Sequence, residues 1–165
     1  MKCCFVTVGT TKFEALIEAL ESDDVQAALV ESGFGRVIVQ YGQGERVPFA
    51  ARAPRPGLVV ESYRLKPAIR GDMETADLIV SHAGYGCLME SLTLGKATVA
   101  VTNSLLMDDH QTEIADALAR GGHAAVCRPA TLAQTLRSTD FSARVRLPPA
   151  QPDAYADFVR CLMSQ

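Results

Sequence analysis

Short apolar runs alternate with stretches of helical periodicity along most of this chain, and this alternation constrains the fold more than any other feature. The first run covers residues 3–8, and apolar residues then recur at the 3.6-residue spacing of a helix from Phe13 to Leu20. Runs that are apolar on both faces are typical of parallel strands covered by helices on both sides. Strands are predicted at 3–8, 36–41, 58–63, 77–81, 97–102 and 124–127. The sequence therefore predicts a doubly wound, Rossmann-like parallel α/β sheet.

The helices predicted between these strands cover 13–20, 24–31, 67–75, 85–94, 109–120 and 131–136. Pro67 is expected to open the third of them, since proline fits the first turn of a helix. A chain of 165 residues fits one domain. Residues 1–147 are predicted to form that α/β domain, and the proline-rich residues 148–152 a linker.

Residues 153–165 are predicted to form a C-terminal docking helix. An apolar stripe at helical spacing marks it, made of Tyr155, Phe158, Val159 and Leu162. The segment is near or below the ~12–15 residues at which isolated helices become marginal in water, so it must pack on something. Two hosts remain open, which are the chain's own sheet and a partner subunit.

Charge and composition exclude several function classes. The net charge is −3 with no basic cluster, which argues against nucleic acid and against docking on anionic lipid. No apolar run approaches the ~18–20 residues of a membrane span, and the N-terminus is strand-like rather than a signal peptide. Five cysteines without a C-x-x-C and three histidines without ligand spacing favour reduced thiols and no metal site. These features predict a cytoplasmic protein that needs no metal.

The segment from Ser81 to Glu90 carries the main functional signal. A buried strand, a turn of small residues and a helix start form a cradle for phosphate, because the backbone N–H groups at residues 83–86 point out of the helix. The turn reads Ala83-Gly84-Tyr85-Gly86. His82 adds a side-chain donor, and Glu90 shares a helix face with Gly86, where it can accept hydrogen bonds from ribose hydroxyls. This order suits a sugar nucleotide, although a plain turn followed by a solvated glutamate would use the same residues.

Two further loops should lie at the same edge of the sheet, beyond the carboxyl ends of the strands. Gly9-Thr10-Thr11 offers backbone N–H and hydroxyl groups to a diphosphate, or is an ordinary turn with a threonine N-cap. The dinucleotide fingerprint G-x-G-x-x-G is absent. In the loop that begins at Asn103, His110 and Gln111 either belong to a capping box or face sugar hydroxyls.

Taken together, His82-Ala83-Gly84, Glu90 and His110-Gln111 resemble the donor-binding signature of GT-B glycosyltransferases, and most closely the glycosyltransferase family 28 C-terminal domain. Within that family, residues 5–11 and 81–84 are similar to the small catalytic subunits of split UDP-N-acetylglucosamine transferases. The resemblance covers nearly the whole chain. It implies that Gly9, Thr10, Thr11, His82, Ala83 and Gly84 lie near phosphate, Glu90 near ribose, and His110 and Gln111 near the sugar. Tyr85 and Cys87 depart from the related motifs, which carry a smaller residue and a hydroxyl there.

The resemblance also implies a reaction and a partner. The chain would be the donor half of an inverting enzyme that moves GlcNAc from UDP-GlcNAc, its substrate, to GlcNAc-diphosphate-dolichol in N-glycan assembly. No cofactor or metal is implied, so the N-terminus of the helix predicted at 85–94 and the side chain of His82 would stabilise the leaving group. The acceptor half would belong to a membrane-anchored subunit on the cytosolic face of the endoplasmic reticulum. The sequence offers no persuasive general base, and the partner is one possible source of it. The alternatives are a split transferase of polyprenyl-linked exopolysaccharide synthesis and a non-catalytic nucleotide-binding scaffold.

Overall fold

A computed structural model describes residues 1–103 and 109–147 of the chain. Within this part, six parallel strands form one sheet in the order β3-β2-β1-β4-β5-β6. The strands are β1 (Lys2–Thr7), β2 (Phe34–Gln40), β3 (Val59–Tyr63), β4 (Leu78–His82), β5 (Ala97–Val101) and β6 (Ala125–Cys127). The helices are α1 (Glu14–Glu21), α2 (Asp23–Glu31), α3 (Arg70–Thr75), α4 (Tyr85–Thr93), α5 (Asp109–Arg120) and α6 (Leu132–Ser138). The predicted doubly wound α/β fold is confirmed.

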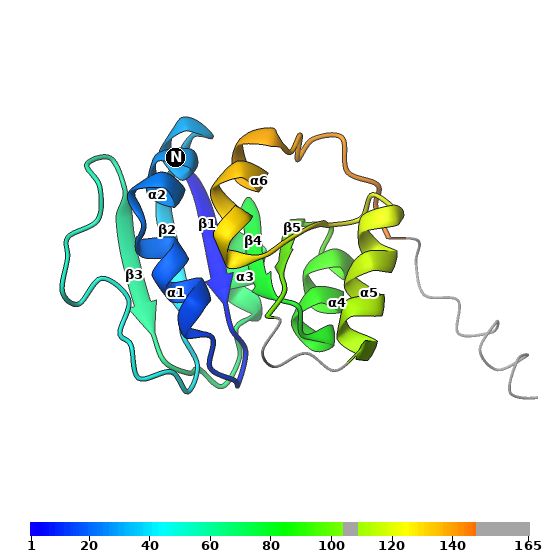
Figure 1. Cartoon of the computed structure of the whole chain (residues 1–165), viewed down its shortest axis with the longest axis horizontal. Coiled ribbons are helices and arrows are strands. Elements are labelled where there is room, and N and C mark those ends of the chain that lie inside the picture. Colours follow the sequence, from blue (N-terminus) through cyan, green and yellow to red (C-terminus); the bar gives the residue numbers. More distant parts are fainter. Residues whose placement is uncertain (104–108, 148–165) are drawn as a thin grey trace, which may run out of the picture.

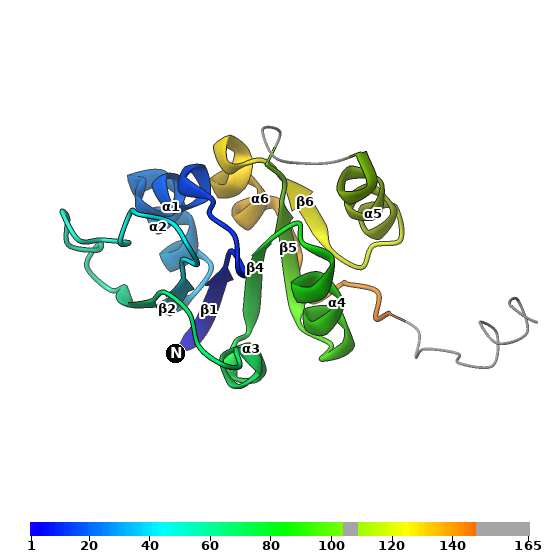
Figure 2. The ribbon, with the colours of Figure 1, turned by 90° about the horizontal axis from the view of Figure 1, so that it is seen from below.

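Helices cover both faces of the sheet, as Figure 2 shows end-on. Side chains of β1 alternate between two cores, with Cys4 and Val6 toward α1, α2 and α6, and Cys3 and Phe5 toward α3. A third cluster joins α4 and α5 to β5 through Leu88, Leu92 and Leu118 among others. Because β1, β4 and β5 are buried along nearly their whole length, their sequences are continuous apolar runs.

The strand order creates a topological switch point between β1 and β4. From β1 the chain first builds outward through β2 and β3, then returns to add β4, β5 and β6 on the other side (Figure 1). The loops that leave β1 and β4 therefore run to opposite faces of the sheet and open a crevice at the carboxyl ends of the strands. Any ligand site of an open parallel sheet is expected there.

The predicted strand boundaries hold to within two residues, but the third helix does not begin where Pro67 predicts. Helix α3 begins at Arg70, and residues 64–69 form a loop instead. Lys66 is held there by Asp72, and the carbonyl of Arg64 accepts a hydrogen bond from Gln40. These side-chain contacts outweigh the local preference of proline for a first helical turn.

The linker at 148–152 and the docking helix with Tyr155, Phe158, Val159 and Leu162 lie outside the described residues and stay predictions. Among the helices that are described, none has the length and hydropathy needed to cross a membrane.

Candidate functional site

A cavity of about 530 Å³ opens at the switch point, beyond the carboxyl ends of β1 and β4. Its walls come from the β1–α1 loop, the end of β2, the β3–α3 loop and the β4–α4 turn with the start of α4. The lining residues are Gly9, Thr10, Gln40, Leu65, Lys66, Pro67, Ala68, Ile69, Arg70, His82, Gly84, Tyr85, Gly86, Cys87 and Glu90. The lining includes two cationic side chains, Lys66 and Arg70, and one carboxylate, Glu90. Lys66 also pairs with Asp72 and Arg70 with Glu74, two carboxylates outside the lining.

The imidazole of His82 sits where the two switch-point loops meet, between two glycines. A Cβ at Gly9 would lie 2.7 Å from His82 Cε1, and one at Gly84 would lie 2.3 Å from His82 Nε2. Only glycine therefore leaves room for the ring, and Gly9 also has a φ of +64°. The sequence motif His-x-Gly thus has a steric cause as well as any role in binding.

The burial of His82 favours the uncharged form of its imidazole. Burial lowers the pKa of His82 below its usual 6.5, and the Thr7 backbone only partly opposes this shift. Its Nδ1 is buried and, among the described residues, has no hydrogen-bond partner. A neutral ring with its proton on Nε2 avoids burying an unpaired N–H and presents that N–H toward Gly84 and the cavity. Burial therefore favours the neutral imidazole over the imidazolium cation, and Nε2 is the ring nitrogen that lies nearest Gly84.

The first turn of α4 supplies further donors to the cavity wall. Gly84 is its N-cap and has no side chain with which to cap the helix. The N–H groups of Tyr85, Gly86 and Cys87 precede the first intrahelical bond, in which Leu88 N donates to Gly84 O at 3.1 Å. These groups carry the positive end of the helix dipole, so an anion is stabilised there.

The β1–α1 loop contributes less than the sequence predicts. Gly9 N donates to Thr7 Oγ1 at 3.1 Å, and Thr11 uses both its N–H and its hydroxyl on the carbonyl of Val8. Only Thr10 keeps an N–H and a hydroxyl without partners among the described residues, and it lines the cavity. Of the three residues that were expected to offer donors to a phosphate, only Thr10 therefore has donors that stay available within the described part of the structure.

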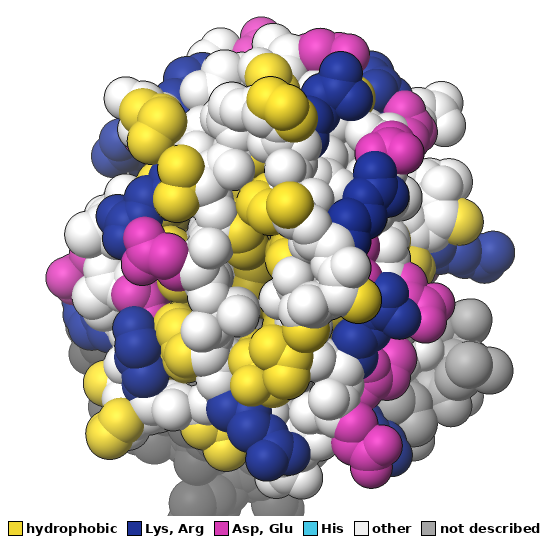
Figure 3. Space-filling model, turned by 90° about the vertical axis from the view of Figure 1, so that its left-hand side faces the viewer, with side chains coloured by type: hydrophobic (Ala, Val, Ile, Leu, Met, Phe, Trp, Pro, Cys, Tyr) yellow, Lys and Arg dark blue, Asp and Glu magenta, His cyan; other side chains and the backbone are white. Residues whose placement is uncertain are grey.

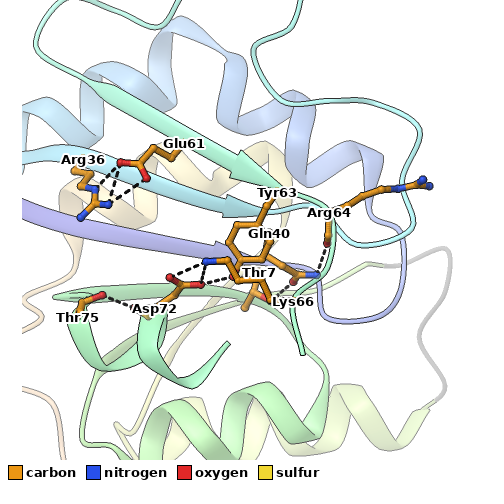
Figure 4. Close-up of polar contacts among 9 residues, drawn as sticks. All are labelled: Thr7, Arg36, Gln40, Glu61, Tyr63, Arg64, Lys66, Asp72 and Thr75. Atoms are coloured by element: carbon orange, nitrogen blue, oxygen red, sulfur yellow. Dashed lines mark hydrogen bonds and ion pairs between the residues drawn. The ribbon is translucent and has the colours of Figure 1, made fainter. Parts of the chain in front are cut away.

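The β3–α3 loop forms the opposite wall and is held by a compact polar cluster (Figure 4). Lys66 Nζ lies 2.9 Å from Asp72 Oδ2 and 3.9 Å from the centre of the Tyr63 ring. The Tyr63 hydroxyl donates to the same carboxylate. Burial and the hydrogen bond to Asp72 raise the pKa of Tyr63, which keeps the phenol protonated. Lys66 is thereby held at the rim of the cavity.

Glu90 lies on the face of α4 that borders the cavity, as its spacing from Gly86 predicts. Its Oε1 is 3.8 Å from Arg70 Nη1, and Arg70 Nε also donates to Glu74 at 2.8 Å. The Glu90 side chain keeps 36% of its exposure, so a ligand in the cavity can reach it. Tyr85 is 61% exposed at the mouth of the cavity.

Several predicted site residues lie elsewhere. Ala83 is buried in the core between α4 and β5, and Thr11 does not line the cavity. Asn103 lines a separate cavity of about 620 Å³ beside α1, with Lys12 and Arg46. His110 and Gln111 lie in the first turn of α5, but the positions of their side chains are outside the described part of the structure.

Two parts of the cavity wall were not predicted from the sequence. Gln40 ends the buried strand β2, residues 65–70 follow the largely exposed strand β3, and neither part carries a motif. The one available signal was position, because both stand at carboxyl ends of predicted strands, where ligands of such sheets bind. Within the described residues, no group of three or more His, Cys, Asp or Glu side chains could hold a metal ion. Cys3, Cys4, Cys87 and Cys127 are free thiols.

The fold and its cavity define a doubly wound α/β domain with a crevice at its switch point, and comparison with known families gives its class. Residues 3–154 match the glycosyltransferase family 28 C-terminal domain, and the chain belongs to that family.

Relatives within the family share a name. Human UDP-N-acetylglucosamine transferase subunit ALG13 is 40% identical over 129 residues, which cover 77% of this chain. That stretch is only 11% of the human protein's length. An NMR structure of ALG13 superposes with a TM-score of 0.68 at 23% identity, covering 96% of this chain and 94% of that one. MurG of Acinetobacter baumannii gives a TM-score of 0.70 at 24% identity, and all of this chain matches 50% of the MurG chain. These two structures confirm the fold, which is one half of the GT-B architecture.

Proposed function

We propose that this chain is the donor-binding catalytic subunit of a heteromeric, inverting N-acetylglucosaminyltransferase. It would bind UDP-GlcNAc and move GlcNAc to GlcNAc-diphosphate-dolichol in N-glycan precursor assembly. The observation that carries the proposal is the switch-point cavity, where the start of α4, His82 and Glu90 line one continuous wall. The relatives' name, UDP-N-acetylglucosamine transferase subunit, supports the choice of donor.

The chemistry of the wall suits the two ends of a nucleoside diphosphate sugar. The N–H groups of Tyr85, Gly86 and Cys87, which precede the first intrahelical bond of α4, would form with His82 Nε2 a donor cluster for the diphosphate. Glu90, one helical turn further, would accept hydrogen bonds from the ribose hydroxyls, and Thr10 would donate from the facing loop. Charge that develops on the UDP leaving group would be stabilised by the same fixed donors, without a metal or other cofactor.

A partner subunit completes the proposal. The relatives' name, which calls them a subunit, supports a partner. This chain matches half of the MurG chain, and we propose that a partner subunit would supply the other half of the active site. Among the described residues that line the cavity, Glu90 is the one carboxylate. It lies near Arg70, and the proposal assigns it to the ribose hydroxyls. The general base that activates the acceptor hydroxyl would therefore come from the partner. A membrane-anchored partner would recruit the chain to the cytosolic face of the endoplasmic reticulum.

The experiment has two arms. Calorimetry of the purified chain should show saturable binding of UDP and UDP-GlcNAc, with much weaker binding of GDP. A radiolabelled transfer assay with lipid-linked GlcNAc should show no transfer by the chain alone and transfer once its membrane partner is added. No binding of any uridine nucleotide would overturn the donor assignment. Robust transfer by the isolated chain would overturn the need for a partner.

A further inference from the structure

The side chain of Gln40 at the end of β2 is held by three hydrogen bonds to two segments around the cavity, the end of β1 with its following loop and the start of the β3–α3 loop. Its Oε1 accepts from Thr7 Oγ1 at 2.5 Å, and its Nε2 donates to Gly9 O at 2.7 Å and to Arg64 O at 3.0 Å. The side chain is only 1% exposed. Figure 4 shows it between the ends of β1 and β3. The orientation of the amide is fixed, because two carbonyl oxygens can only accept and must face Nε2.

This network also holds both polar backbone groups of Gly9. The Gly9 carbonyl accepts from Gln40, and the Gly9 N–H donates to the Thr7 hydroxyl that itself donates to Gln40. Gly9 is the residue whose missing side chain leaves room for His82. The position of Gly9, and with it the space for the imidazole, therefore depends on the Gln40 amide.

The third bond crosses to the opposite wall. Arg64 directly precedes the segment 65–70 that lines the cavity, and its carbonyl also accepts from Gly42 N at 3.0 Å. One buried amide thus fixes the β1–α1 loop and the β3–α3 loop relative to each other. The distance between these walls sets the width of the cavity.

We infer that Gln40 is a positioning residue for the donor: its amide sets the spacing between the Thr10 side and the Lys66–Arg70 side of the cavity. The inference rests on the proposed function, since it assigns a role in binding the same ligand. Loss of the amide should leave the sheet intact but let the two loops separate, so that UDP no longer meets both walls at once.

A second buried glutamine provides a matched control. Gln26 on α2 is also 1% exposed, and its amide likewise joins two backbone groups, donating to Glu21 O at 2.8 Å and accepting from Arg55 N at 2.6 Å. It lies away from the cavity lining. Gln40→Met and Gln26→Met each replace a buried amide by an apolar side chain of similar length. If Gln40 had only a structural role, the two substitutions would have the same effect on UDP affinity.

The test measures melting temperature and UDP affinity of the wild-type chain and both variants. Both variants should have a lower melting temperature than the wild type. Gln40→Met alone should also weaken UDP binding, by about tenfold or more, which corresponds to the loss of ~1.4 kcal/mol of preorganisation. Equal UDP affinity in Gln40→Met and wild type would overturn the inference. If Gln40→Met does not fold, Thr7→Val, which removes one member of the network and keeps the side-chain shape, is compared with Gln26→Met by the same criterion. Wild-type chain that binds no UDP would instead refute the proposed function itself.

Discussion

At the scale of single residues, Glu90 is the side chain whose role depends most directly on the proposed ligand. It borders the cavity, stays partly exposed and makes, among the described residues, only a long contact of 3.8 Å to Arg70. Glu90→Ala should therefore leave the fold intact and weaken UDP binding by about 1.5–3 kcal/mol, the value of hydrogen bonds to a charged group. Calorimetry measures the change. The control is Glu74→Ala, which removes the other partner of Arg70 outside the cavity. Unchanged affinity in Glu90→Ala would show that the carboxylate is only a solvated surface group.

His82 gives the chain a pH-dependent stability whose sign follows from its burial. Because its folded pKa is lower than the unfolded value of 6.5, the unfolded chain binds the proton first as the pH falls. Its contribution is present in full above pH 6.5 and is lost as the pH falls from there toward the lower folded pKa. The melting temperature should drop across this window in wild type and drop less in His82→Gln. Parallel pH profiles of the two proteins would mean that the His82 ring is freely protonated in the folded state.

At the scale of elements, the start of α4 depends on the contact between Gly84 and His82. A Cβ at position 84 would meet the imidazole, whereas one at Gly86 would have nothing within 4 Å. Gly84→Ala should displace the ring, lower the melting temperature and weaken UDP binding. Gly86→Ala should raise stability by about 0.5–1 kcal/mol, since alanine replaces glycine within a helix. Thermal melts and calorimetry on both variants decide this, and equal behaviour would contradict a packed ring.

The C-terminal segment is an element that only the sequence predicts. Removal of residues 152–165 should abolish association with the membrane partner while the α/β core stays folded, because the described sheet is already covered on both faces. Co-purification of the shortened chain with its partner, together with circular dichroism, tests this. Retained association at wild-type yield would exclude the segment as the tether, and an unfolded core would assign it to the chain's own sheet.

The elements also show how far sequence reasoning reaches. Buried strands such as β4 and β5 are predictable because burial on both faces leaves a continuous apolar run. The His82–Glu90 wall is predictable because a strand, small residues and a helix start form a local pattern. The loop at 64–69 is not, since its shape depends on Gln40, which lies 24 positions before Arg64 in the sequence, and on the contact of Lys66 with Asp72 in the next helix. A single glutamine at a strand end has no pattern, and only the folded chain brings its three partners together.

At the scale of the whole molecule, the switch point turns separate loops into one site. Segments from residues 9–10, 40, 65–70 and 82–90 meet there because β1 and β4 are neighbours in the sheet. In the sequence, by contrast, Leu78 comes 70 positions after Val8.

A different part of the surface lies at the edge of the sheet. Figure 3 shows the side of the molecule formed by the edge strand β3, where scattered apolar side chains lie among charged ones. Val59 and Leu65 are about half exposed there.

The central claim is that the switch-point cavity binds the nucleotide sugar, and a residue-resolved NMR titration of the labelled chain with UDP-GlcNAc tests it most directly. The account predicts saturable shifts of the amide signals of Thr10, Lys66, Gly84 and Gly86, which line the cavity. The signals of Gln26 and of other α2 residues, remote from that lining, should stay in place. Saturable shifts centred on α2 and α6, or no saturable shifts at all, would contradict the claim.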